Sequence, residues 1–180
     1  MAFKFTPLNI PDVLLIQADK FSDDRGYFLE AYKKSEYENQ IPTNFSQDNF
    51  SFSKKDVLRG LHYQAAPYSQ GKLVRVLQGT IWDVAVDLRP SAKTFKQWVA
   101  RELSEENGLT LYIPEGFAHG FVVTSPEARV YYKTTKEYNR EFERGIIWND
   151  KTLNIAWPVT QPIVSEKDLL LPAFDQVELV

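Results

Sequence analysis

Short β-type runs separated by turn residues recur along this chain and limit the folds open to it. Valine, isoleucine, phenylalanine, tyrosine and tryptophan are frequent in these runs, as is typical of strands. Five segments are predicted to be strands: Leu73–Leu77, Ile81–Leu88, Leu109–Ile113, Gly120–Thr124 and Ala128–Thr134. The intervening turn Gln78–Thr80 suggests that the first two form a hairpin. Closely spaced strands predict an all-β sandwich or barrel, in one domain over residues 1–180.

Helical signals are few and short. A helix is predicted over Ser35–Gln40, where Ser35 and Glu38 have the spacing of a capping box. A second helical turn is predicted from Ser165, with Asp168 three residues later. The fold class is therefore all-β with a few short helices.

The segment Gln47–Ser53 alternates polar and aromatic side chains. Period two places Gln47, Asn49, Ser51 and Ser53 on one face and two phenylalanines on the other. From this segment alone, a solvent face over a core face is the simpler interpretation. The alternative is a polar barrel lumen whose phenylalanines pack outside, between sheets or subunits.

Composition excludes several classes of protein. A net charge of -3 and a pI of about 5.5 argue against a nucleic-acid surface, although a few placed cations could still hold a phosphate. No apolar run approaches the ~20 residues of a membrane-spanning helix, and the N-terminus lacks the apolar core of a signal peptide. There is no cysteine, which excludes disulfides and thiolate sites. We expect a cytoplasmic protein without a membrane or nucleic-acid partner.

The chain has only two histidines, His62 and His119, and each is framed by glycine and apolar residues. Histidine exchanges protons near neutral pH, so both are candidates for chemistry in a partly dry pocket. A metal site is not favoured, because the two histidines are far apart and the residue two after His62 is Gln64. No P-loop or dinucleotide glycine motif is present either, although a nucleotide could still bind through stacking and arginine. We expect no cofactor.

General acid–base chemistry fits the two histidines better than metal binding does. His62 is the natural base, and a carboxylate such as Asp168 would stabilise its imidazolium, although Asp168 also has the spacing of a helix cap. Of Tyr131 and Tyr132, adjacent on a predicted strand, one would face a lumen and serve as an acid, although most strand tyrosines are core residues. Three cations lie near glycine or aromatic residues, but each alone is more often a surface charge: Arg25, Arg59 and Lys72.

The ordered set of these segments resembles the dTDP-4-dehydrorhamnose 3,5-epimerase family, whose members are cupin-type enzymes of nucleotide-sugar metabolism. The resemblance covers about residues 24–172. It rests on Asp24–Glu30, Gln47–Ser51, Val57–Gln64, Lys72–Val76, Asp83–Arg89, Ile113–Phe121, Tyr132–Lys133, Trp148–Asp150 and Ser165–Asp168.

The resemblance implies a homodimer of cupin-type jelly-roll subunits with the active site in the mouth of each barrel. In this family the N-terminal segment often adds to the partner's sheet, so part of a site comes from the other subunit. No metal is implied. The implied substrate is dTDP-4-keto-6-deoxy-D-glucose, and the product, dTDP-4-keto-L-rhamnose, is inverted at C-3 and C-5.

The resemblance also implies a role for each site residue. His62 would be the base with Asp168 as its partner, Lys72 would stabilise the enolate oxygen, and Tyr132 would return a proton to the opposite face. Four residues would contact the sugar or the diphosphate: Gln47, Asn49, Arg59 and His119. Five would bind the nucleotide half: Arg25, Phe28, Glu30, Glu143 and Lys167.

Two details depart from a simple strand and from the family pattern. Strict alternation would put Arg59 and His62 on opposite faces, so we expect a bulge or turn at Gly60. Asp56 and Lys96 stand at apparent turn positions where the family commonly has glycine.

The nearest rival function is that of a relative that inverts a single centre of another deoxysugar. A ketoisomerase would carry a closely spaced histidine pair, which is absent. A non-catalytic sugar-binding cupin would not need the base, its partner, the acid and Lys72 together. A metal-dependent cupin oxygenase is the weakest alternative.

Overall fold

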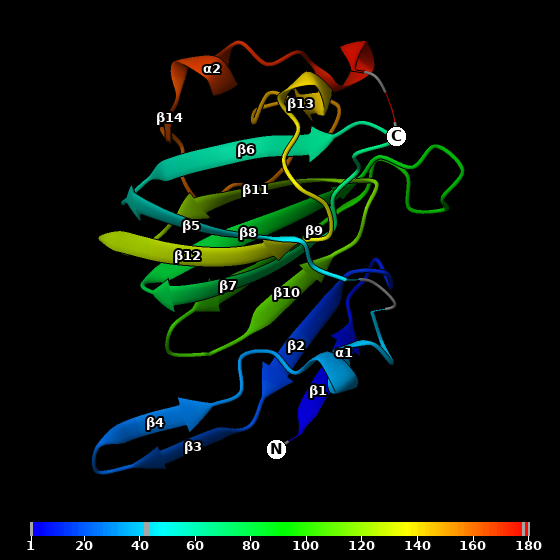
Figure 1. The fold of residues 1–180 in the computed structure, drawn as a ribbon. Coiled ribbons are helices and arrows are strands. Elements are labelled where there is room, and N and C mark those ends of the chain that lie inside the picture. Colours follow the sequence, from blue (N-terminus) through cyan, green and yellow to red (C-terminus); the bar gives the residue numbers. More distant parts are fainter. Residues whose placement is uncertain (1, 42–43, 178, 180) are drawn as a thin grey trace.

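A computed structural model describes residues 2–41, 44–177 and 179 and shows two β-sheets stacked as a sandwich (Figure 1). The first sheet has the order β1 (Phe3–Pro7), β2 (Leu14–Ala18), β10 (Thr110–Ile113), β7 (Lys72–Gln78), β12 (Glu127–Thr134) and β5 (Gln47–Lys54). The second has the order β13 (Glu143–Gly145), β6 (Val57–Gln64), β11 (Phe117–Val123), β8 (Thr80–Asp87) and β9 (Trp98–Ser104), with β14 (Ile163–Val164) beside β6. Only the β14–β6 pairing is parallel among the described strands.

The remaining elements lie at the two ends of the sandwich. The hairpin of β3 (Lys20–Asp23) and β4 (Gly26–Leu29) projects away from it, as Figure 1 shows in blue. The helices are α1 (Lys34–Tyr37) and α2 (Glu166–Leu169), with 3-10 turns at Arg140–Phe142 and Phe174–Gln176. The all-β jelly-roll prediction is confirmed. No helix in the described part of the chain has the length and apolar character to cross a membrane.

Apolar side chains from both sheets form the main core of the sandwich. Val74 and Val130 of the first sheet pack in the same cluster as Ile81 and Phe121 of the second. Two further clusters are separate from this main core. One lies between the second sheet and the C-terminal segment, around Leu61 and Phe174, and the other lies around Tyr37 of α1. The main core fills one part of the space between the sheets, which leaves the other part for polar side chains.

The predicted hairpin between Leu73–Leu77 and Ile81–Leu88 is wrong, although both segments are strands and the turn between them exists. β7 belongs to the first sheet and β8 to the second, so the chain crosses from one sheet to the other at Gly79. Gly79 has φ of 78°, and a Cβ there would lie 2.0 Å from the carbonyl oxygen of Glu127. The positive φ and this close approach both require glycine at the point where the chain crosses between the sheets.

The first helix is shorter than predicted, and its predicted capping box is wrong. α1 begins at Lys34 with Lys33 as N-cap, and no side chain caps it. Ser35 therefore lies within the first turn, where its hydroxyl cannot serve as the N-cap acceptor. The helical turn predicted from Ser165 is confirmed, because the Ser165 hydroxyl accepts a hydrogen bond from the Asp168 amide.

The polar face of β5 points into the sandwich. Gln47, Asn49 and Ser51 line a cavity, while Phe50 and Phe52 are 59% and 44% exposed on the outer face. The simpler interpretation of this segment was therefore wrong, and the polar-lumen alternative is correct.

Candidate active site

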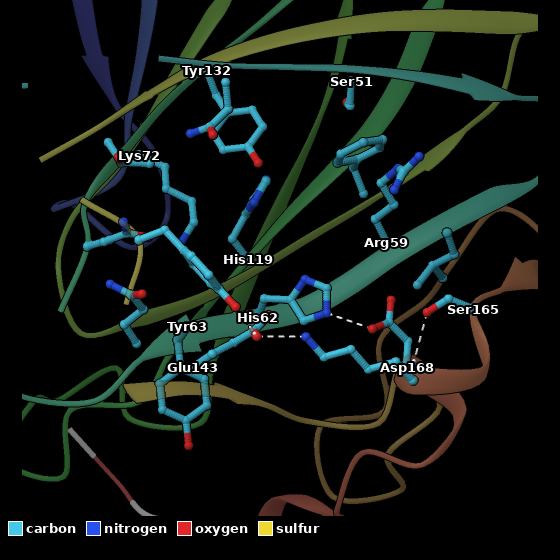
Figure 2. Close-up of a pocket in the computed structure, with 18 of the residues that line it drawn as sticks. Ser51, Arg59, His62, Tyr63, Lys72, His119, Tyr132, Glu143, Ser165 and Asp168 are labelled. Atoms are coloured by element: carbon cyan, nitrogen blue, oxygen red, sulfur yellow. Dashed lines mark hydrogen bonds and ion pairs between the residues drawn. The ribbon is translucent and has the colours of Figure 1, made fainter. Parts of the chain in front are cut away.

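A cavity of about 590 Å³ opens between the two sheets and gathers residues distant in sequence (Figure 2). This volume suits a small-molecule site. Ten of the predicted site residues line it: Gln47, Asn49, Arg59, His62, Lys72, His119, Tyr132, Glu143, Lys167 and Asp168.

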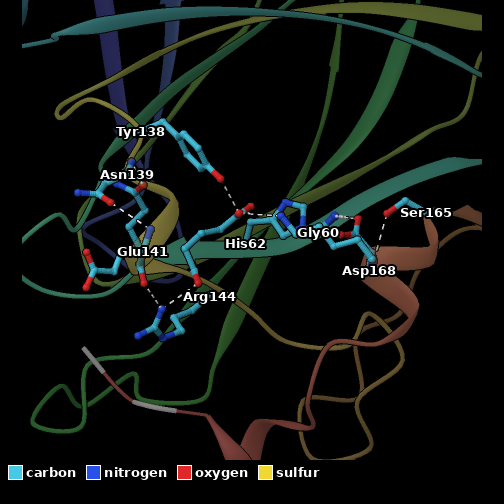
Figure 3. Close-up of polar contacts among 11 residues, drawn as sticks. Gly60, His62, Tyr138, Asn139, Glu141, Arg144, Ser165 and Asp168 are labelled. Atoms are coloured by element: carbon cyan, nitrogen blue, oxygen red, sulfur yellow. Dashed lines mark hydrogen bonds and ion pairs between the residues drawn. The ribbon is translucent and has the colours of Figure 1, made fainter.

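His62 and Asp168 form a hydrogen-bonded pair at the side of this cavity (Figures 2 and 3). The His62 Nε2 and Asp168 Oδ1 atoms are 2.8 Å apart, and the other carboxylate oxygen accepts from the Gly60 amide. Burial raises the pKa of Asp168, but the hydrogen bonds from His62 and Gly60 outweigh it and hold the pKa below its usual value. Asp168 is therefore an ionised partner of His62, and the interpretation of its side chain as a helix cap is wrong.

A β-bulge in β6 brings Arg59 and His62 to the same cavity. The register of β6 on β11 pairs His62 with His119 and Arg59 with Phe121, so two residues of β6 face one of β11. Gly60 sits in the bulge with φ of 126°, and a Cβ there would lie 2.6 Å from the Cα of Gly120. The predicted irregularity at Gly60 is confirmed.

The two unusual turn positions also behave as predicted. Asp56 and Lys96 adopt φ values of 64° and 66°, the left-handed region that favours glycine. Both turns form despite the side chains, and neither residue lines the cavity.

Tyr132 and Lys72 enter the cavity from the first sheet, opposite the strand that carries His62 (Figure 2). Tyr132 points inward from β12, and its neighbour Tyr131 points outward, where Lys133 contacts its hydroxyl. Burial raises the pKa of Tyr132 against a smaller opposing effect of Arg59, so the phenol holds its proton at neutral pH. Burial lowers the pKa of Lys72 to about 8.

Polar side chains beside this centre are held by one another. The Arg59 guanidinium donates through Nε to the Ser53 hydroxyl at 2.9 Å. The Gln47 side-chain amide donates to the Asn49 side-chain oxygen at 2.8 Å and accepts from the Tyr138 backbone amide at 2.7 Å. These contacts fix the direction of Arg59 and Asn49 before any ligand binds.

An ion pair lies at the mouth of the cavity. Lys167 of α2 contacts Glu143 at 2.7 Å, and the Tyr138 hydroxyl donates to the same Glu143 oxygen at 2.7 Å. Burial raises the pKa of Glu143, but these two hydrogen bonds outweigh the effect of burial and hold the pKa below its usual value. The carboxylate is therefore ionised. Tyr138 was not predicted as a site residue, since nothing in its sequence context distinguishes it from eight other tyrosines.

Three predicted ligand residues lie outside the cavity of their own chain. Arg25 is in the β3–β4 turn, where its side chain is 90% exposed beside Asp23. Phe28 is 60% exposed on β4. Glu30 directly follows β4, and its Oε2 atom is buried without a hydrogen-bond partner among the described residues. A single chain therefore does not bring these three to the site.

No cluster of three or more His, Cys, Asp or Glu side chains suited to metal binding occurs in residues 2–41, 44–177 and 179. Each histidine instead has an aspartate at one ring nitrogen. The arrangement is suited to proton transfer and to holding an anion.

Comparison with known proteins decides the family. The family model described as dTDP-4-dehydrorhamnose 3,5-epimerase matches residues 7–176. The chain belongs to the dTDP-4-dehydrorhamnose 3,5-epimerase family. The Shigella flexneri member named dTDP-4-dehydrorhamnose 3,5-epimerase is 52% identical over 163 residues, which cover 89% of this chain and 90% of that one.

Solved structures of dTDP-4-dehydrorhamnose 3,5-epimerases and their relatives share this fold. The Legionella pneumophila epimerase, solved with dTDP-4-keto-L-rhamnose, is 42% identical with a TM-score of 0.95, over 98% of this chain and 95% of that one. A 3'-monoepimerase from Streptomyces bikiniensis, solved with dTDP-quinovose, is 27% identical with a TM-score of 0.87, over 93% and 86% of the two chains. The fold alone therefore does not distinguish double from single inversion.

Proposed function

We propose that this chain is an isomerase that converts dTDP-4-keto-6-deoxy-D-glucose to dTDP-4-keto-L-rhamnose, in the biosynthesis of dTDP-L-rhamnose. Family membership and the names of the relatives support the reaction. The observation that carries it is the placement of His62, paired with Asp168 of α2, and of Tyr132 on opposite sheets that face one cavity.

The chemistry follows from the acidity of the carbons beside the C-4 ketone. A proton on C-3 or C-5 is removable because the electron pair of its C–H bond moves into the carbonyl and forms an enolate. His62 takes this proton, and Nδ1 is the ring nitrogen for the task because Nε2 is bonded to Asp168. Asp168 stabilises the resulting imidazolium.

Inversion requires that a proton return to the opposite face of the same carbon. Tyr132 lies on the opposite sheet from His62 and holds its proton, so it donates from the other side as the enolate collapses to the ketone. Lys72 provides positive charge for the enolate oxygen in a buried position, where such a charge is most effective. The sequence of events needs no cofactor or metal.

The product distinguishes this function from its nearest rival. NMR of the product made from dTDP-4-keto-6-deoxy-D-glucose should give ring proton couplings that report inversion at both C-3 and C-5. Inversion at one centre would replace the proposal with a single-centre epimerase, and unchanged sugar would leave a sugar-binding protein. The 52% identity to a named double epimerase, against 27% to the 3'-monoepimerase, favours double inversion.

The charge on Lys72 predicts an alkaline limit to activity. Its pKa of about 8 leaves the ammonium charged at pH 7 and half charged at about pH 8. The value of kcat/KM, which reports the pKa values of the free enzyme, should therefore fall as pH rises through 8, because the neutral amine stabilises the enolate less. In Lys72→Arg the fall near pH 8 should disappear, since arginine stays charged. An unchanged alkaline limb in that variant would contradict the assignment of Lys72.

We also infer a homodimer in which each β3–β4 hairpin serves the partner's cavity. The hairpin projects from the sandwich and exposes aromatic side chains, with Tyr27 at 53% and Phe28 at 60% (Figure 1). Arg25, at its tip, is remote from its own cavity yet belongs to a segment that resembles the nucleotide site of the family. If the hairpin enters the cavity of a second subunit, Arg25 can bind the nucleotide there although it is remote from the cavity of its own chain.

Mixing two defective variants tests the shared site. Arg25→Ala, assayed below KM, and His62→Asn should each be nearly inactive alone. In a mixed dimer, the cavity that keeps His62 receives an intact Arg25 from the other chain, so activity should return after subunit exchange. Failure to regain activity, in a mixture shown to contain mixed dimers, would place Arg25 in its own chain's site or outside it.

A further inference from the structure

Asp83 is a fully buried carboxylate directly behind the cavity. It lies on β8, has no exposed surface, and does not line the cavity itself. Its Oδ2 atom is 2.8 Å from Nε2 of His119, which does line the cavity. Its Oδ1 atom is buried without a hydrogen-bond partner among the described residues. Asp83 is therefore hydrogen-bonded to the cavity lining through His119, and it also interacts electrostatically with Lys72.

Such a carboxylate costs stability. Removing an ionised carboxylate from water is expensive unless hydrogen bonds satisfy both oxygens, and an apolar side chain of similar size would avoid this cost. Asp87, four residues later on the same strand, is equally buried but satisfies both oxygens with Arg89 and Thr94. Asp87 is fully explained as a structural residue, whereas Asp83 is not.

The pairing fixes which ring nitrogen of His119 faces the cavity. A carboxylate oxygen accepts hydrogen bonds, so Nε2 of His119 carries the hydrogen that lies between the two groups. The cavity then meets Nδ1, which donates a hydrogen bond only when the ring is an imidazolium. Figure 2 shows the His119 ring between Lys72 and His62, where a ligand anion would meet it.

Two ionisable side chains, Asp83 and Lys72, lie close to His119. Burial raises the pKa of Asp83, whereas the hydrogen bond to His119 and the charge of Lys72 lower it, so these two neighbours favour the carboxylate over the acid. With both groups charged, Asp83 contributes one negative charge and Lys72 one positive charge. With an imidazolium at His119, the three side chains Asp83, Lys72 and His119 together would carry one net positive charge, which matches the single negative charge of an enolate. On the neighbouring strand of the same sheet, His62 is paired with His119 in register, but its ring has its own partner, Asp168, and its side chain remains 34% exposed, as a proton acceptor should.

We propose that Asp83 is a positioning residue that holds His119 in its Nε2–H form and favours the imidazolium as negative charge develops beside it. The two histidine–aspartate pairs then have different tasks. The His62 pair moves a proton, and the His119 pair, with Lys72, holds the anion that results. The identity of that anion as an enolate rests on the proposed function.

The ring state of His119 can be measured on the unmodified protein. With only two histidines in the chain, ¹⁵N–¹H correlation of the imidazoles can be assigned by comparison with a His62→Asn sample. We expect a protonated Nε2 on His119 at every pH at which the protein is folded. An unprotonated Nε2 would overturn the proposal. The protonation state of the His119 ring is measured without turnover. A protein that is inactive on every sugar would therefore contradict the proposed function but would leave the role of Asp83 to be decided by the ring measurement.

Substitution of Asp83 tests whether it acts through His119. Asp83→Asn keeps an oxygen but removes the charge, and kcat should fall by about 10- to 100-fold, as for other groups that orient an active-site histidine. In a protein that already carries His119→Asn, the Asp83→Asn substitution should lower kcat by less than about threefold, because the effects of two coupled residues do not add. Fully additive losses would overturn the proposal.

Asp87→Asn is the matched control, because it removes a buried charge from the same strand. It should lower the thermal midpoint and leave kcat and the His119 ring signals unchanged. If Asp83→Asn does not fold, the ring measurement on the unmodified protein still decides the proposal.

Discussion

Replacing His62 with asparagine is expected to lower kcat by roughly 10²- to 10⁴-fold, the contribution of a positioned general base. The other groups around the substrate would remain, but none of them would accept the proton from C-3 or C-5. Asparagine approximates the shape of the ring and can still donate to Asp168, so the fold should survive. Single-turnover assays with dTDP-4-keto-6-deoxy-D-glucose measure the loss.

Binding provides the control for this variant. The nucleotide half of the ligand is assigned to other residues, among them Glu143 and Lys167, so calorimetry should give an affinity for dTDP close to that of the unmodified protein. Turnover within a few-fold of normal, at unchanged affinity, would show that His62 is not the base.

Replacing Tyr132 with phenylalanine should separate proton removal from inversion. His62 would still form the enolate, so hydrogen at C-3 or C-5 would still exchange with solvent. The missing hydroxyl would prevent proton return to the opposite face, and net epimerisation should fall by roughly 10²- to 10⁴-fold. The expected result is deuterated starting sugar of unchanged configuration in heavy water.

Tyr131→Phe is the matched control for Tyr132→Phe. Tyr131 is the preceding residue of β12, but its side chain points to the outer face, where its hydroxyl contacts Lys133. Its loss should leave epimerisation unchanged. Inversion of both centres at the normal rate by Tyr132→Phe would remove Tyr132 from the role of acid.

Much of the fold could be predicted from sequence because the strands have strong local signals. The segments now assigned to β7, β8, β10, β11 and β12 were all recognised, since β-branched and aromatic residues mark them. The pairing of β7 with β8 was wrong because a turn sequence does not reveal whether the chain folds back or crosses to another sheet. The packing at Gly79 is also not visible locally, because the backbone that it meets, at Glu127, is distant in sequence.

The site could be predicted in part. The His62–Asp168 pair joins residues 106 apart, and only the resemblance selected Asp168 over its simpler interpretation as a helix cap. Asp83 lies within a segment that resembles the family, but the resemblance implies no role for it. The signal was available, since a carboxylate inside the apolar run Ile81–Val86 is expected to be buried and to need a partner. The placement of Arg25 depends on a second subunit, which strand patterns in one chain do not reveal.

The most direct test of the central claim is hydrogen exchange during turnover, followed by NMR in heavy water with dTDP-4-keto-6-deoxy-D-glucose. The account predicts that deuterium enters at both C-3 and C-5, that the product is inverted at both, and that His62→Asn shows neither change. Inversion without deuterium from solvent, or exchange at neither carbon, would contradict an enolate mechanism based on His62 and Tyr132.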